Sequence, residues 1–382
     1  MTLSRRQTLA ILGGGTILAA TAAGGYAITR SPQTATAPWA AAGSYSEPRR
    51  KALSYAVLAP NPHNRQPWIV DLSVPDQVTL YADQDRLLPH TDPFSRQIVV
   101  GLGCFLEIMS LAAAEDGYAV ELDLFPEGMP EEALDGRPVA VARFVPGQGR
   151  PEPTLFAEVP HRRSLKEPYD LDRPVSEEAL KSLEAVVTSG SVVASTNDPA
   201  RVQALRERTR DAFIVEFETD RTYKESVDLF RIGHKEVDAN PDGLDFSGPM
   251  FESLRLAGLF SRESAMDRGS VSYKSGLDMV QATSMTGMAY IWLTTHGNSR
   301  HEQIAAGRDW VRLNLASTAL GIGVQPMSQG LQEFPEMAGH YAALHSMLAP
   351  GGGTVQMLGR LGYGPSVGQS PRWPLETRIV PG

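Results

Sequence analysis

Three side chains with polar or charged groups stand at every second position near the middle of the chain. These residues are Arg162, Ser164 and Lys166. In an extended segment, side chains two residues apart point to the same side, so a guanidinium, a hydroxyl and an ammonium group would form one row, and Arg163 would point away. Such a row can bind an anion such as a phosphate through charge-assisted hydrogen bonds. The alternative is a solvated basic turn before a helix.

A second segment, residues 59–68, is rich in proline and in amide side chains. Pro60, Pro62 and Pro67 each fix φ and lack a backbone donor, so the segment is stiff and cannot be the interior of a helix. A stiff loop can hold a planar ring. The alternative is a proline-rich turn before a strand.

Two segments near the C-terminus are further candidates for ligand binding. Residues 314–324 have the small residues of a buried helix followed by a glycine turn, and Pro326 follows two positions after this segment. Arg372 lies in a proline-rich tail, residues 370–374. For the first of these segments the alternative is a plain core helix that ends at a glycine.

In their order along the chain, these segments resemble the nitroreductase superfamily, and within it the branch of Acg-type FMN-binding proteins, over roughly residues 45 to 380. Residues 59–68 resemble the flavin-edge loop written APSxxNxQPW, and residues 162–166 resemble the RxSxR/K element. The resemblance implies bound FMN, and it implies the cofactor more firmly than it implies turnover. The loop residues that it places at the flavin are Asn61, Pro62, His63, Asn64 and Gln66.

The resemblance also implies roles for the basic residues. Arg162 and Ser164 would bind the phosphate or ribityl region of FMN, and Arg372 would close on the phosphate. Lys166 would lie near flavin N1 and C2=O, where a cation stabilises the anionic reduced ring.

Residues 326–329 would supply the reacting edge of the flavin with backbone donors. By resemblance, the N–H groups after Pro326, those of Met327, Ser328 and Gln329, would face N5, the atom that takes or gives hydride. Many relatives have an acidic residue where Ser328 or Gln329 stands. The usual handling of a nicotinamide donor is therefore not implied.

The expected fold is α+β, a three-layer α/β/α sandwich of nitroreductase type, with two fused halves that form an intrachain pseudo-dimer. Each half shows a helix, a strand, a long apolar helix and a strand. The expected helices are residues 47–58, 97–117, 176–189, 200–219 and 309–320, and the expected strands are residues 68–72, 77–82, 139–145, 191–194 and 354–359. The expected domains are a signal and linker (1–38), a first half (39–155) and a second half (156–382) with an insertion or lid at about 200–270. The alternative is two α+β halves that share a common pattern without duplication.

The charged insertion could contain a lid over the ligand. Phe251, Leu254, Leu256, Leu259 and Phe260 have the spacing of a helix with one apolar face. Such a helix could cover a flavin, and an ordinary surface helix is the alternative. The side chains expected beneath it are Tyr290, Trp292 and His296.

The N-terminus resembles a twin-arginine (Tat) export signal. Arg5 and Arg6 precede an apolar, uncharged run from Leu9 to about Ile28. The Tat translocase carries folded proteins, which suits a protein that binds its cofactor before export. The expected location is the periplasm or the outer face of the cytoplasmic membrane, and an uncleaved membrane anchor is the alternative.

Composition excludes several classes of protein. The chain has 42% hydrophobic and 21% charged residues and a formal charge of -9 without a basic run, so a nucleic-acid partner is not expected. Cys104 is the only cysteine, which excludes an intrachain disulfide and, within an apolar run, indicates core packing. No metal site is expected, because the paired histidines are spaced by five residues and no HExxH motif occurs.

Two functions follow, and they belong to different classes. The first is an exported FMN oxidoreductase, monomeric with an internal pseudo-dimer, that passes a hydride through N5 to a small acceptor such as a quinone or a nitro compound. Its electron donor is unknown. The second is a lid-shielded protein that binds or sequesters FMN with little NAD(P)H-dependent turnover. A membrane-anchored structural domain without cofactor is a third interpretation.

Overall fold

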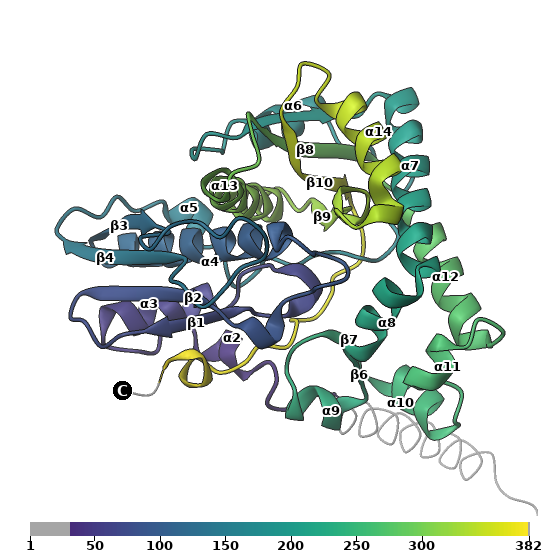
Figure 1. The fold of residues 1–382 in the computed structure, drawn as a ribbon, viewed down its shortest axis with the longest axis horizontal. Coiled ribbons are helices and arrows are strands. Elements are labelled where there is room, and N and C mark those ends of the chain that lie inside the picture. The colour runs from purple at the N-terminus through teal and green to yellow at the C-terminus, as the bar shows by residue number, and fades with distance from the viewer. Residues whose placement is uncertain (1–30, 381–382) are drawn as a thin grey trace, which may run out of the picture.

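The computed structural model describes residues 31–380, which fold around two four-stranded sheets and two long buried helices (Figure 1). The twin-arginine motif and the apolar run after it lie outside the described residues, so the export signal stays a prediction.

The first sheet has the order β1, β2, β4, β3, and all its neighbouring strands are antiparallel. Its strands are β1 (Trp68–Asp71), β2 (Gln77–Ala82), β3 (Tyr118–Leu124) and β4 (Ala140–Pro146). Every second residue of β2 is buried, as expected for a sheet with one covered face. Helices α3 (Pro48–Ala56) and α4 (Arg96–Glu115) provide the cover.

The second sheet has the order β5, β8, β10, β9 and is also antiparallel. Its strands are β5 (Val192–Thr196), β8 (Ala289–Thr295), β9 (Gly323–Pro326) and β10 (Thr354–Gly362). Helix α13 (Arg300–Ala319) lies on one face, and α7 (Pro199–Glu218) and α14 (Ala338–Leu348) lie on the other (Figure 1). The three-layer α/β/α arrangement is therefore complete around this sheet, whereas the first sheet has helices on one face only.

Residues 220–284 form a smaller unit beside the second sheet. It contains α8 (Asp220–Asp228), β6 (Phe230–Ile232), α9 (His234–Ala239), β7 (Leu244–Phe246), α10 (Pro249–Leu256), α11 (Arg262–Met266) and α12 (Val271–Ser284). Its own apolar cluster includes Tyr223, Phe230 and Tyr273. We call residues 220–284 the helical insertion. The remaining helices of four or more residues before it are α2 (Ala37–Ala41), α5 (Pro153–Phe156) and α6 (Glu177–Glu184).

The expected lid helix does not cover the aromatic residues of β8. Tyr290 and Trp292 pack beneath α7 and α14, and the Trp292 Nε1 donates to the carbonyl of Leu348 at 3.1 Å. The expectation was wrong because alternate residues of β8 face opposite sides of the sheet, and this side is the one that α7 and α14 cover. Within α10 and the turn after it, Leu256 and Leu259 are exposed to solvent.

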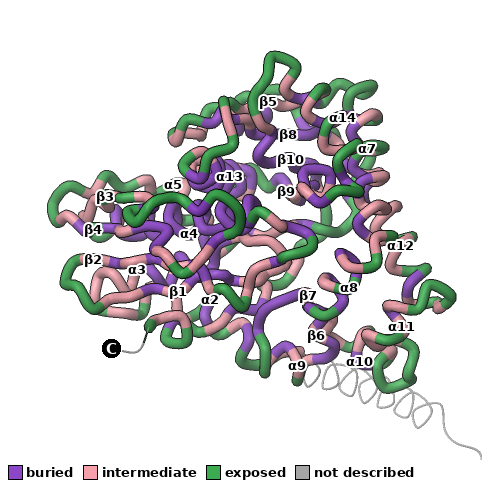
Figure 2. The backbone as a smooth tube through the Cα atoms, viewed as in Figure 1, coloured by how far each residue is buried: buried purple, intermediate pink, exposed green. Residues whose placement is uncertain are grey.

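The closest contact between the two halves is the crossing of α4 with α13, deep in the molecule (Figure 2). Gly103 and Gly307 face each other there, and a Cβ atom on either would clash with backbone of the opposite helix. Cys104 beside them is buried, and its Sγ lies 3.1 Å from the Gly307 carbonyl. The prediction that Cys104 is core packing is confirmed.

Ion pairs fix the same crossing further along the two helices. The buried Glu107 of α4 accepts from Arg308 at 2.7 Å and from Arg312 at 2.8 Å, both on α13. Arg312 also pairs with Glu152. Two arginines and two carboxylates balance one another, which a buried charge requires.

Among the described residues, one helix is long and apolar enough to cross a membrane. This helix is α4, whose most apolar window is 94% buried inside the protein. It is the core helix of the fold.

The prediction of an α+β fold with two fused halves is confirmed. In the first half, α3, β1, β2, α4 and β4 each begin and end within two residues of the expected positions. A strand was expected after each of the two long buried helices, without bounds, and β3 and β9 lie there; β8 was not expected, and α13 begins nine residues earlier than expected. The domain boundaries stay a prediction.

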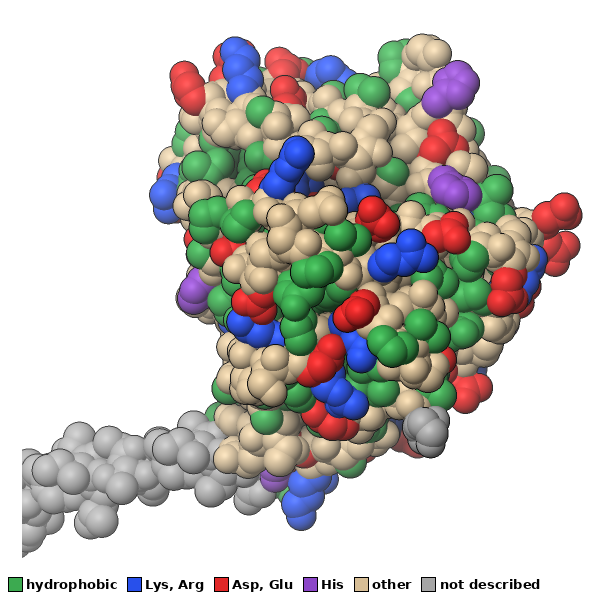
Figure 3. All heavy atoms as spheres, turned by 90° about the vertical axis from the view of Figure 1, so that its left-hand side faces the viewer, with side chains coloured by type: hydrophobic (Ala, Val, Ile, Leu, Met, Phe, Trp, Pro, Cys, Tyr) green, Lys and Arg blue, Asp and Glu red, His purple; other side chains and the backbone are tan. Residues whose placement is uncertain are grey.

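Acidic and basic side chains are interspersed on the face shown in Figure 3, and neither sign dominates it.

We expect Gly307→Ala to lower the free energy of unfolding by about 1–3 kcal/mol or more, because the new methyl group must displace backbone of α4. Gly339→Ala in α14 is the control, since no atom lies within 4 Å of its Cβ position. The control should be neutral or slightly stabilising. Chemical denaturation of both variants checks this, and equal stability of the two would contradict the tight crossing.

Candidate functional site

The proline-rich loop lies against α4 in an unusual backbone conformation. His63, Asn64 and Gln66 have φ values of 48°, 51° and 51°, in the left-handed region that few residues other than glycine adopt. The Gln66 N–H donates to Oδ1 of Asn61 at 2.7 Å and closes the loop on itself. A Cβ atom on Gly101 of α4 would lie 3.1 Å from the Cβ of Asn61, so the loop needs a glycine there. Strain of this kind concentrates at functional sites.

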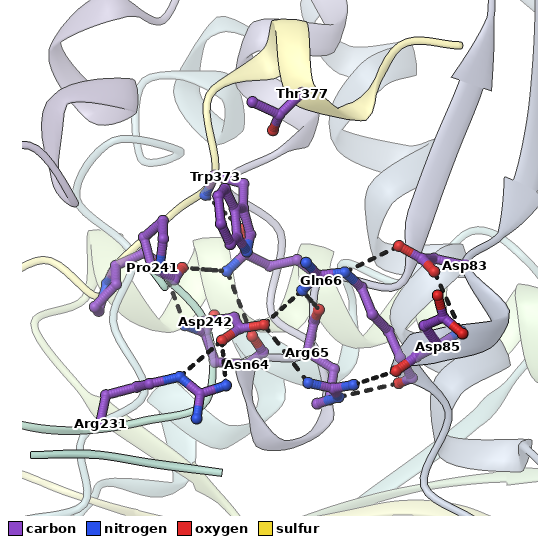
Figure 4. Close-up of polar contacts among 12 residues, drawn as sticks. Asn64, Arg65, Gln66, Asp83, Asp85, Arg231, Pro241, Asp242, Trp373 and Thr377 are labelled. Carbon is purple, nitrogen blue, oxygen red and sulfur yellow. Dashed lines mark hydrogen bonds and ion pairs between the residues drawn. The ribbon is translucent and has the colours of Figure 1, made fainter. Parts of the chain in front are cut away.

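The C-terminal tail and the helical insertion hold this loop from two sides (Figure 4). Gln66 is buried, and its Oε1 accepts from the N–H of Trp373 at 2.8 Å while its Nε2 donates to the carbonyl of Pro241 at 2.7 Å. Asn64 accepts from Nη1 of Arg372 at 2.6 Å. The loop, the tail and the insertion therefore form one structure.

Asp242 of the insertion carries the ion pairs of this contact (Figure 4). Its carboxylate is buried and accepts from Arg86 at 2.6 Å and from Arg231 at 2.7 Å, and Arg65 lies 3.5 Å away. Arg65 and Arg86 belong to the first half, whereas Arg231 belongs to the insertion. One acidic side chain thus joins the insertion to the proline-rich loop.

Two buried arginines, Arg162 and Arg372, and the half-buried Arg163 form a cluster at the start of the loop. Arg162 and Arg372 both donate through Nη2 to the carbonyl of Leu58, at 3.3 and 3.1 Å. Arg163 lies over the ring of Trp39, with 4.5 Å from its Cζ to the ring centroid, and Arg372 lies 5.5 Å from the same ring. Within residues 31–380, none of these three arginines forms an ion pair. Arg163 was expected to point away from the row, and it lies beside Arg372 instead.

Several donors of this arginine cluster are buried without a partner. They are Nε and Nη1 of Arg162, Nε of Arg163 and Nε of Arg372. Burial lowers the pKa of Arg162 to about 10, and burial, with the charges of Arg162 and Arg163, also lowers the pKa of Arg372 well below its usual range. Buried, unpaired charges of one sign are costly. A phosphate group fits this place, because it would accept from the free donors and neutralise the charge.

The row of Arg162, Ser164 and Lys166 runs along the edge strand of the second sheet. Ser164 forms a parallel bridge with Val324 of β9, and the next residue donates its N–H to the Val324 carbonyl at 2.9 Å. Lys166 is exposed to solvent, yet surrounding protein lowers its pKa, an effect that Asp245 opposes. The row therefore connects the arginine cluster to the segment after β9.

The segment after Pro326 offers two backbone donors rather than three. The Met327 N–H donates to the carbonyl of Leu358 at 2.8 Å, and the Met327 side chain is buried under α7 and α14. Within the described chain, the N–H groups of Ser328 and Gln329 have no backbone acceptor. The carbonyl of Ser328 accepts from Nε2 of Gln97 on α4, which fixes this segment to the first half.

The four segments that the sequence singled out are brought together in space. Arg372 of the tail contacts Asn64 of the loop and lies beside Arg162, and Lys166 is close enough to His63 to lower its pKa. Sequence reasoning missed the stacking of Trp39 and the anchoring residue Asp242. Nothing in the local sequence marks them, because Trp39 contacts Arg163 and Arg372, and Asp242 pairs with Arg65 and Arg86, all more than a hundred positions away.

The comparisons with known proteins give relatives but no matching family model. Over 321 residues, which are 84% of this chain and 86% of the relative, the sequence is 25% identical to the putative NAD(P)H nitroreductase Rv3131 of Mycobacterium tuberculosis. Over 77 residues, 20% of this chain and 23% of the relative, it is 34% identical to the putative NAD(P)H nitroreductase acg of the same organism.

Two solved structures are similar at low scores. The FMN-dependent nitroreductase NfnB from Mycobacterium smegmatis, in complex with NADPH, covers 55% of this chain and 91% of its own, with 17% identity and a TM-score of 0.30. A putative nitroreductase from Anabaena variabilis covers 87% and 92%, with 12% identity and a TM-score of 0.41. The similarity to Rv3131 extends over most of both chains, whereas the similarity to acg is confined to about a fifth of this chain.

Proposed function

We propose that this protein is an FMN-dependent oxidoreductase of the nitroreductase type, with a small quinone or nitro compound as electron acceptor. When bound, FMN would supply two-electron chemistry at N5. The observation that carries the proposal is the cluster of the buried Arg162 and Arg372 with the half-buried Arg163, which has free donors and, within residues 31–380, no counter-anion. The names of the mycobacterial relatives agree with it.

Each part of FMN would be bound by a different set of residues. Arg162 and Arg372 would hold the phosphate, and Ser164 would bind the phosphate or ribityl chain. The stiff loop from Asn61 to Gln66 would support the ring, with the Lys166 ammonium at its pyrimidine side. The N–H groups of Ser328 and Gln329 would face N5.

Location and electron donor are separate parts of the proposal. We propose export by the Tat translocase to the periplasm or to the outer face of the cytoplasmic membrane, on the strength of Arg5, Arg6 and the apolar run after them. Little nicotinamide nucleotide is available there, so a quinol or a redox protein would serve as donor. The relatives are named for NAD(P)H, which makes a nicotinamide donor the competing choice.

A second function is favoured by one specific observation. Asp242 joins the helical insertion to the first half through Arg65, in the proline-rich loop, and Arg86, and Pro241 binds the buried Gln66. A closed insertion of this kind could shield a bound flavin from donors. The protein would then bind or sequester FMN without turnover.

The first prediction concerns the phosphate contact. We expect Arg162→Met and Arg372→Met each to weaken FMN binding about tenfold to a hundredfold, because a hydrogen bond to a charged group contributes roughly 1.5–3 kcal/mol. Binding of riboflavin, which lacks the phosphate, should be unchanged. Fluorescence titration of both ligands measures this.

The control is Arg143→Met, at an exposed arginine of β4. It should alter neither titration. Equal losses for FMN and riboflavin in the cluster variants would show that these arginines hold the loop rather than a phosphate.

The choice between the two functions depends on reduction by physiological donors. The flavin-loaded protein is followed anaerobically by its visible spectrum while NADH, NADPH and a quinol are added in turn. Bleaching by one of them identifies the donor and supports an oxidoreductase. A flavin that only dithionite reduces supports the shielded binder, and a protein that takes up no flavin contradicts both.

A third prediction tests whether the insertion is a shield. We expect Asp242→Asn to loosen the insertion, because it removes the negative charge that three half-buried arginines on both sides of the contact share. Amide hydrogen exchange in residues 220–284 should become faster, and iodide should quench the flavin more strongly. Asp228→Asn, at an exposed pair with Lys224, is the matched control. Unchanged exchange in Asp242→Asn would exclude this carboxylate as the latch.

A further inference from the structure

One buried carboxyl group is held by neutral partners alone. Glu216, on α7, is 5% exposed and accepts from Nε2 of Gln332 at 2.8 Å and from Oγ of Ser226 at 3.3 Å. In the described chain no cation pairs with it, and Glu225 on α8 is close enough to disfavour its negative charge. A carboxyl group in such surroundings tends to keep its proton.

The pKa of Glu216 agrees with this geometry. Burial raises it to about 7, although hydrogen bonds from Gln332 and Ser226 and the nearby side chain of Gln329 act in the opposite direction. The group therefore exchanges its proton near neutral pH. This property makes it suitable as a proton donor.

Ser226 joins Glu216 to the proline-rich loop. Its Oγ lies 2.9 Å from Nε2 of His63 and 3.3 Å from the Glu216 carboxylate. Burial, together with the charges of Lys166 and Arg65, lowers the pKa of His63 to about 4, so its ring is neutral at neutral pH. A neutral imidazole has one donor and one acceptor nitrogen, and a hydroxyl group can both donate and accept.

The chain Glu216, Ser226, His63 can therefore adopt two hydrogen-bond orders. With Glu216 protonated, its O–H donates to Ser226, whose O–H donates to Nε2 of His63, and the ring carries its proton on Nδ1. With Glu216 ionised, Nε2–H of His63 donates to Ser226, whose O–H donates to the carboxylate. The two orders differ by one proton and one change of histidine tautomer.

We propose that Glu216, Ser226 and His63 form a proton relay from the interior beneath the helical insertion to the candidate site. The inference rests on the proposed function, in which reduction of a quinone to a hydroquinone needs one hydride and one proton. In the relay the Glu216 O–H bond breaks as a Ser226 O–H forms, and the former Ser226 proton forms Nε2–H on His63. The Nδ1–H of His63 breaks, and its proton goes to the acceptor oxygen. Electrons do not move through the relay.

The position of His63 connects the relay to the site. It lies in the loop that supports the ligand, in the left-handed conformation, and faces the charges of Lys166 and Arg65. At the other end, Glu216 lies beside Gln329, which belongs to the segment expected at N5. The relay thus begins next to one residue of the candidate site and ends at another, His63, and the insertion contributes its central hydroxyl.

The test uses the histidine tautomer, which is measured without turnover. In ¹⁵N NMR spectra of the full-length protein, we expect His63 to change from the Nδ1–H to the Nε2–H tautomer as the pH rises through about 7. The resonance is assigned with His63→Gln. Glu216→Gln and Ser226→Ala should abolish the change, and Glu218→Gln, at an exposed carboxylate on the same helix, should retain it.

The possible results distinguish a failure of the relay from a purely structural role of these residues and from a failure of the proposed function. A His63 tautomer that stays the same on both sides of pH about 7 overturns the relay, as does a switch that survives in Ser226→Ala. Failure to bind FMN in a titration would overturn the proposed function. The tautomer measurement needs no FMN, so it would still confirm or contradict the hydrogen-bonded chain. If FMN binds with equal affinity to wild type and Glu216→Gln, the carboxyl group is not needed to hold the cofactor.

A pH profile provides the second measurement. In the FMN-loaded protein, acceptor reduction should fall as the pH rises through about 7, because Glu216 then loses the proton that it supplies. In Glu216→Gln the rate of acceptor reduction should be lower by about tenfold or more, since general acid catalysis contributes typically at least 10²-fold and water can replace it in part. Its rate should also no longer fall as the pH rises through about 7. The same fall in rate with rising pH in Glu216→Gln would overturn the proposal.

Discussion

The close crossing of α4 and α13 is the constraint on which the rest of the structure depends. Because Gly103 and Gly307 lack side chains, the two helices meet at backbone distance, and Glu107 then reaches arginines on the opposite helix. The crossing sets the distance between the two sheets. The proline-rich loop lies against α4, and the basic row is bridged to β9 of the second sheet, so a shift at the crossing would separate the loop from the row.

The same helix positions both sides of the site. Gly101 of α4 accommodates the proline-rich loop, while Gln97, one turn earlier, donates to the carbonyl of Ser328 in the second half. The start of α4 is itself fixed by Asp92, which accepts from the N–H groups of Gln97 and Ile98. A single rigid helix therefore aligns the loop expected under a flavin ring with the backbone expected at its reacting atom.

Buried charge has three different arrangements around the site, and each fits a different role. Asp242 is balanced by arginines, which suits a structural joint between the insertion and the loop. Arg162 and Arg372 have no counter-anion among residues 31–380, which suits a place for a phosphate. Glu216 has only neutral partners and a raised pKa, which suits a group that holds and releases a proton. The proposed chemistry follows from these differences in pairing, not from the number of charges.

The sequence by itself determined the stiff loop, the basic row, the α+β class and most elements of the first half, because proline geometry, alternation and apolar periodicity act over a few residues. It could not show that Arg163 turns towards Trp39, that Tyr290 lies under α7, or that α13 begins at Arg300. Partners distant in the chain decide these features. The tertiary structure alone assembled the arginine cluster and the Glu216 relay, since charge balance and desolvation depend on which segments meet in space.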